Sequence, residues 1–160
     1  FFHMNYKHLN IYNNLIKLTR NKKIFEKLSN EETFSDRLVL LMIHFAFFLK
    51  EYKDSKNKNE LQQIHDFFFK QIDLSIREIG YGDASINKKM KEYINLFFVI
   101  VSKIDQWNNL SKQKKSLFLS NFLYIEENPS FLIKYFDKYI DYLQNNTLNY
   151  FTKDVIKHNF

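Results

Sequence analysis

Apolar side chains recur every three or four residues along most of the chain, a spacing typical of amphipathic α-helices. One such stripe consists of Leu61, Ile64, Phe68, Ile72, Ile76 and Ile79. A second consists of Ile86, Met90, Tyr93, Phe97, Ile100 or Val101, and Ile104. No stretch alternates with the two-residue period of a half-buried strand. The pattern therefore predicts an all-α fold, a single-domain bundle of about six helices.

Polar residues mark where the other helices are expected to begin and end. Asn21 is a candidate break in a first helical segment, Ile11–Leu28. Ser35 is the expected N-cap of a helix that continues to about Tyr52, and a solvated loop is expected at 53–59. Two later helices are expected to start at Ser111 and at Asn128–Pro129. The last helix is expected to end at Asn145–Asn146.

The domain boundary is expected near the start of the first stripe. Residues 1–10 would form an N-terminal extension, and 11–160 the helical domain. Met4 is a candidate native start, in which case residues 1–3 are an added remnant. No signal peptide is expected, because polar residues interrupt every apolar run before Leu18.

The most apolar run is LVLLMIHFAFFL, Leu38–Leu49. It is well short of the roughly 20 residues that a membrane-spanning helix needs. Polar pairs close it off on both sides, Asp36-Arg37 before it and Lys50-Glu51 after it. The run is interpreted as a buried central helix, with contact to a membrane as the alternative.

The only two glycines of the chain, Gly80 and Gly82, lie in the stretch REIGYGD. A phosphate-binding loop would need a strand before the glycines, and here a helical stripe precedes them. We therefore expect a corner between two helices. Gly80 would end the first helix in a left-handed conformation, Gly82 would permit the turn, and Asp83 or Ser85 would cap the next helix.

Composition limits the kinds of active site and metal site that the chain can form. With no cysteine, the chain cannot form disulfides, Cys-ligated zinc sites or thiol-based active sites. The five histidines are scattered; His44 and His65 could be metal or haem ligands, but satisfied core or boundary histidines are the preferred interpretation. No H-E-x-x-H motif or Ser/His/Asp arrangement occurs. Neither catalysis nor a cofactor is expected.

Charge and aromatic content point to binding. The net charge is +6, with 24 Lys and Arg against 18 Asp and Glu, which favours anionic partners. Basic clusters lie at 88–91 and 112–115 and are either solubilising faces or contacts for RNA, ribosome or anionic lipid. Phe67–Phe69 and Phe97-Phe98 exceed what one stripe buries, so other helices, a partner or a membrane surface should cover them.

REIGYGDASINKKMK, preceded by Asp73, resembles the central signature of the ubiquinol–cytochrome c chaperone family. IYNNLIKLTRNKKIFEKL is similar to the opening helix of that family, and FSDRLVLLMIHFAFFL to its Arg- and His-containing helix. The resemblance covers about Ile11 to Trp107, and Phe97-Phe98-Val99-Ile100 departs from it because members often carry Phe-Tyr-Gly-Arg. The residues at family positions, all candidates for partner binding, are Arg37, His44, Asp73, Arg77, Glu78, Gly80, Gly82, Asp83, Lys88, Lys89 and Lys91.

The resemblance implies a non-enzymatic assembly factor of the cytochrome bc complex that binds newly made cytochrome b. It further implies a ribosome contact, a small partner subunit and peripheral contact with an anionic membrane. The expected location is the cytoplasmic face of a bacterial inner membrane, or the matrix side in mitochondria. A basic helical module that binds ribosome or nucleic acid is the alternative, with no specific DNA contact expected.

Overall fold

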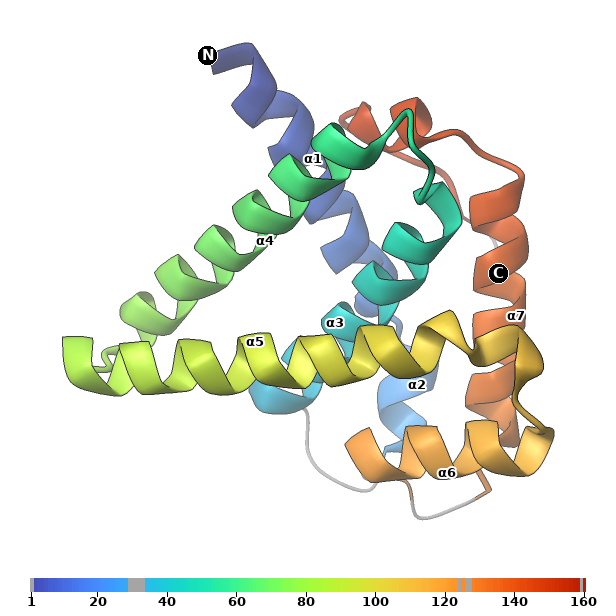
Figure 1. Cartoon of the computed structure of the whole chain (residues 1–160). Helices are drawn as coiled ribbons and strands as arrows, with labels where there is room; N and C mark the ends of the chain where they lie inside the picture. Colours follow the sequence, from blue (N-terminus) through green and yellow to red (C-terminus); the bar gives the residue numbers. More distant parts are fainter. Residues whose placement is uncertain (1, 29–33, 124, 126–127, 159) are drawn as a thin grey trace.

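The computed structural model describes residues 2–28, 34–123, 125, 128–158 and 160 and consists almost entirely of helices (Figure 1). Within these residues the only pairing of strand type is an isolated bridge between Leu28 and Ile125. The prediction of one all-α bundle is confirmed. The elements are α1 Phe2–Thr19, α2 Lys22–Lys27, α3 Phe34–Tyr52, α4 Lys58–Ile79, α5 Asp83–Asp105, η1 Trp107–Asn109, α6 Lys112–Phe122, α7 Ser130–Gln144 and η2 Leu148–Thr152.

The break expected at Asn21 divides the first helical segment into α1 and α2. Asn21 has extended backbone angles, and its side chain accepts a hydrogen bond from the Lys23 N–H at 3.0 Å, as an N-cap does. The helix before the break already includes residues 2–10, so this stretch is part of α1. The structure thus has seven α-helices among its described residues, one more than the expected number.

α3 is the central helix, and the other helices are arranged around it (Figure 1). Every residue from Leu41 to Phe48 is buried, because α1, α5 and α7 all pack against α3. The interpretation of this run as a buried helix is confirmed. Ser35 is not its N-cap, since α3 already begins at Phe34 and Ser35 lies inside the first turn. In the described part of the chain, none of the helices has the length and apolarity needed to span a membrane.

Aromatic rings fill the core between α3, α4 and α5. The Phe45 ring stacks on Phe68 with centroids 4.1 Å apart and on Phe97 at 5.5 Å. Phe69 also meets Phe97, at 5.2 Å. Most of the surplus phenylalanines are therefore covered by other helices of the same chain. Phe98 is the exception, with 76% of its surface exposed.

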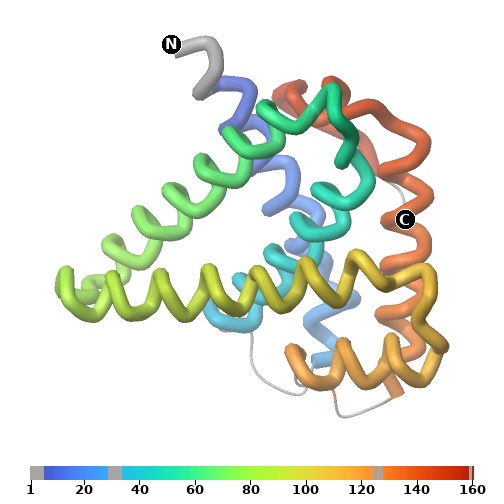
Figure 2. Tube along the Cα trace, in the orientation of Figure 1, coloured from blue at the N-terminus to red at the C-terminus, as the bar shows by residue number. Residues whose placement is uncertain are grey.

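The C-terminal segment returns to the side of α1, as the trace shows (Figure 2). The Asn14 side-chain amide on α1 donates to the carbonyls of Phe151, at 2.9 Å, and Lys153, at 2.8 Å. Asn14 is fully buried, so these bonds replace the water that its amide nitrogen would otherwise bind. The sequence pattern did not predict this return.

Candidate functional site

The corner between α4 and α5 carries the two glycines at one tip of the molecule (Figure 1). Gly80 has φ +102° and ψ +16°, and its N–H donates to the Arg77 carbonyl at 3.0 Å. A left-handed residue directly after a helix is a common C-terminal cap, and glycine adopts it without strain. The predicted role of Gly80 is confirmed. The stripe of α4 ends earlier than expected, because Ile79 is 53% exposed.

The start of α5 differs from the prediction. Gly82, with φ −72° and ψ 160°, is the N-cap, and no side chain caps this helix. Asp83 is already the first helical residue, so neither it nor Ser85 occupies the capping position. The Asp83 carboxylate instead accepts a hydrogen bond from the Arg77 guanidinium. This charge-assisted bond links the start of α5 to the last turn of α4.

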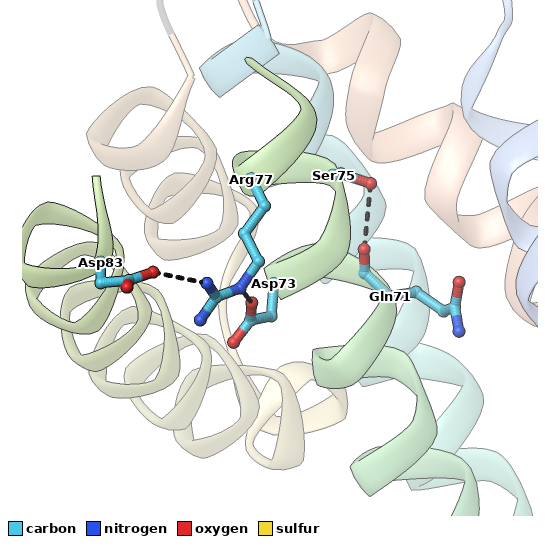
Figure 3. A network of polar contacts seen from close by, with 5 residues as sticks. All are labelled: Gln71, Asp73, Ser75, Arg77 and Asp83. Carbon is cyan, nitrogen blue, oxygen red and sulfur yellow. Dashed lines mark hydrogen bonds and ion pairs between the residues drawn. The ribbon is translucent and has the colours of Figure 1, made fainter. Parts of the chain in front are cut away.

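Arg77 joins the two helices across the corner (Figure 3). Its Nε donates to Asp73 Oδ1 at 2.6 Å, and its Nη1 donates to Asp83 Oδ1 at 2.8 Å. The hydrogen bond that the guanidinium donates to Asp73, followed by the one that it donates to Asp83, raises its pKa further above the ordinary value. All three side chains are at least partly open to solvent, so salt screens these pairs. Arg77, which the sequence offered as a candidate for partner binding, thus acts as a clamp between the two helices. Glu78 beside it is exposed.

Lys88, Lys89 and Lys91, in the basic cluster at 88–91, do not form one patch. The Lys89 ammonium lies over the Tyr81 ring, 5.1 Å from its centroid, and so belongs to the corner. Lys88 and Lys91 are exposed on α5. Only these two of the three present their side chains largely to solvent.

His44 lies in the core, so its side chain is not part of the protein surface. It is fully buried, with Nδ1 2.7 Å from the Leu40 carbonyl and Nε2 2.6 Å from the Tyr135 hydroxyl. Because a carbonyl only accepts, Nδ1 carries the proton and Nε2 accepts from the tyrosine. Burial lowers the pKa of His44 to about 4, so the ring is neutral at pH 7.

His65 has different neighbours from His44. It lies beside Asp66, at 3.2 Å, and near the rings of Phe69 and Phe97. Among the described residues no group of three histidine, aspartate or glutamate side chains could hold a metal ion.

A pocket of about 910 Å³ lies between α1, α2, α3 and α4. α4 separates it from the clamp: Ser75 and Gln71 lie on the opposite side of the helix from Arg77 and Asp73 (Figure 3). Ser75 and Ile72 line the pocket, as does Arg37, so one family position opens onto it. The sequence analysis missed the pocket. No local signal could have revealed it, because its walls come from four helices.

Exposed apolar side chains are concentrated on the α4–α5 hairpin and α6. Ten large apolar residues of the described chain are substantially exposed, and seven of them fall between residues 74 and 117. Ile94 and Phe98 are one turn apart on the same face of α5. The seven are Leu74, Ile79, Tyr81, Ile94, Phe98, Val99 and Leu117.

Comparison with protein families gives one match. The family model described as ubiquinol-cytochrome C chaperone matches residues 26–117, more than half of the chain. The matched span contains α3, the corner, the clamp and the seven exposed apolar side chains. No curated protein and no solved structure matches the chain.

Proposed function

Because the chain belongs to the ubiquinol-cytochrome C chaperone family, we propose that it assists assembly of the cytochrome bc complex by binding newly made cytochrome b. The proposed role is binding without catalysis. The observation that carries the proposal is the set of exposed apolar side chains on the α4–α5 hairpin and α6. A protein that holds an unassembled membrane subunit must offer apolar surface of this kind.

The outer face of α5 is the strongest part of this surface. Phe98 is 76% exposed and Ile94 44% exposed, and they neighbour each other along the helix. Full burial of a side chain of either type stabilises a complex by roughly 1.5–3 kcal/mol. An apolar segment of cytochrome b that covered both would gain most of that amount from Phe98 and less than half of it from Ile94, since Ile94 is only 44% exposed.

The corner supports the same proposal. Ile79 and Tyr81, on either side of Gly80, are 53% and 42% exposed. The Arg77 clamp fixes the angle at which they are presented. A surface already held in one arrangement loses less conformational entropy on binding than a mobile one.

Two exposed lysines suggest where the protein works. Lys88 and Lys91 lie on α5 in the turns before Ile94. We propose that they attract the chain to a ribosome or to anionic lipid at the inner membrane, where it associates peripherally. The location would be the cytoplasmic face in a bacterium or the matrix side in a mitochondrion, and a small partner subunit would cover part of the remaining surface.

A deletion strain tests the assembly role. Loss of the chain should lower the level of assembled cytochrome b, and the wild-type chain should restore it. Phe98→Asp combined with Ile94→Asp should fail to restore it, and the purified variant should no longer capture cytochrome b from native membranes. The matched control is Val155→Asp, since Val155 is 70% exposed but lies outside the family match. Normal cytochrome b levels in the deletion strain would disprove the proposal.

A basic ribosome- or nucleic-acid-binding module is the second candidate. It rests on exposed lysines that continue from α5 onto α6, namely Lys88, Lys91, Lys103, Lys112 and Lys114. Binding of this kind weakens steeply as salt rises. Salt-sensitive binding of RNA or ribosomes, with no capture of cytochrome b, would favour this second function.

A further inference from the structure

The pocket between α1, α2, α3 and α4 has an apolar interior. Its volume, about 910 Å³, is in the range of sites that enclose a small molecule. The apolar and aromatic side chains that line it are Tyr12, Ile16, Phe25, Phe34, Leu38, Leu41 and Ile72.

The polar groups in the wall already have partners inside the protein. The Thr19 hydroxyl donates to the Ile16 carbonyl at 2.7 Å, and the Ser75 hydroxyl donates to the Gln71 carbonyl at 3.0 Å. A ligand with polar groups along its length would find few unmet hydrogen-bonding groups there. A hydrocarbon chain suits such a wall better.

The mouth of the pocket is cationic. Among the residues that the structure describes, Arg20, Lys22 and Arg37 line it, and Glu26 is the one acidic side chain that does. All four are exposed, so their charges lie at the opening and not in the interior. Arg20 and Lys22 form no ion pair with any residue that the structure describes.

From this arrangement we propose that the pocket binds one hydrocarbon chain of an anionic amphiphile, with its carboxylate or phosphate headgroup held by Arg20 and Lys22. An apolar interior under a positive rim complements such a molecule in both parts.

A membrane-protein segment fits the rim less well. The loops that flank spanning helices on the cytoplasmic side are enriched in lysine and arginine, and a cationic rim repels them. The pocket is therefore a separate site from the apolar face of α5, and it does not depend on the assembly role.

Calorimetric titration of the purified chain tests the proposal. The probes are sodium laurate and lysophosphatidylglycerol, each kept below its micelle-forming concentration. We expect saturable binding of one molecule per chain. Lengthening the fatty acid from laurate to myristate should tighten binding by roughly tenfold, as burial of two more methylenes requires. The cationic dodecyltrimethylammonium should bind at least about tenfold more weakly than laurate.

One variant tests the cationic rim of the pocket, and a second tests its apolar interior. Arg20→Glu with Lys22→Glu should weaken laurate binding by about tenfold or more. Lys134→Glu with Lys138→Glu makes the same charge change on α7, at exposed residues outside the pocket lining, and should leave laurate binding unaltered. Ser75→Leu should narrow the interior and weaken laurate binding. Thermal melting of each variant checks that it is folded, and the rim pair, which is on the surface, tests the proposal even if Ser75→Leu unfolds the chain.

Four results would overturn the proposal. The first is no saturable binding of either anionic probe, and the second is equal binding of the cationic probe. The third is an equal loss in the α7 control, since this would mean that only general charge attracts the amphiphile. The fourth is tighter binding of an apolar peptide than of laurate, weakened by Ser75→Leu, since this would make the pocket a protein-binding site.

Discussion

α3 and the α4–α5 corner both lie in the family match, but they place their polar residues in opposite environments. On α3, His44 is fully buried and both ring nitrogens have protein partners. At the corner, Arg77 lies in solvent and holds two carboxylates that are themselves accessible. A change in the first acts through folding, whereas a change in the second can act directly on a partner. Residues at family positions therefore need not share a role.

Phe45 and Phe98 show the same contrast between a buried and an exposed side chain. Substituting each of them is expected to give the largest difference in stability. Phe45→Ala should lower the free energy of unfolding by about 3–5 kcal/mol, because it removes a buried ring that stacks on both Phe68 and Phe97. Phe98→Ala should change it by no more than about 0.5 kcal/mol, since that ring is mostly in water. Urea denaturation of both variants measures the difference. Equal losses would mean that Phe98 is packed and that the contrast does not hold.

A pH series tests the buried histidine. The pKa of His44 is about 4 in the folded chain and about 6.5 when unfolded, so the unfolded chain binds the proton more readily between these values. The stability that the neutral ring contributes is fully present above pH 6.5 and is lost as the pH falls toward 4. The free energy of unfolding should fall by about 3 kcal/mol over this window.

His44→Gln separates this effect from that of other titrating groups. The variant should be less stable than the wild type at pH 7, because it disturbs the bonds to Leu40 and Tyr135. It should also lose less stability on acidification, since no imidazole remains to be protonated. If the two stability curves run parallel from pH 7 to pH 4, His44 is not the group responsible.

Substitutions at Gly80 and Gly82 should differ in stability by less than those at the two phenylalanines. Gly80→Ser should cost about 1 kcal/mol, because φ is +102° and a Cβ there is strained. Nothing lies within 4 Å of a Cβ at either glycine, so the cost is conformational and not a clash. Gly82→Ser should be neutral or slightly stabilising, because serine is a favoured N-cap. Thermal melting of the pair measures this, and equal effects would argue against a left-handed Gly80.

The Arg77 clamp predicts the smallest effect on stability. Arg77→Gln should lower the melting temperature by less than Gly80→Ser does, because exposed ion pairs contribute little. The difference from the wild type should shrink further in concentrated salt. A large loss that persists in salt would show that the clamp is a structural requirement of the fold.

The helices themselves could be predicted from the sequence because their signal is local. The stripe Ile86, Phe97, Ile100 and Ile104 on α5 is buried as its spacing requires. Gly80 could be predicted for a similar reason, since a rare glycine directly after a stripe has few other uses.

The polar contacts of the corner were only partly predictable. Asp83 can either cap a helix or pair with a cation, and the sequence offers no way to weigh one against the other. The structure resolves this because Arg77, in the last turn of α4, reaches across the corner. The pocket was beyond prediction, since Tyr12, Phe25, Leu41 and Ile72 meet only when four helices have packed.

The bonds from Asn14 to the carbonyls of Phe151 and Lys153 have a consequence for folding order. These contacts join residues 137 and 139 positions apart, and closing a loop of that length costs chain entropy before the bonds form. During synthesis α1 leaves the ribosome well before Phe151 and Lys153, so it cannot complete its packing until they follow. α1 and the segment around Phe151 should therefore fold together, in one cooperative step.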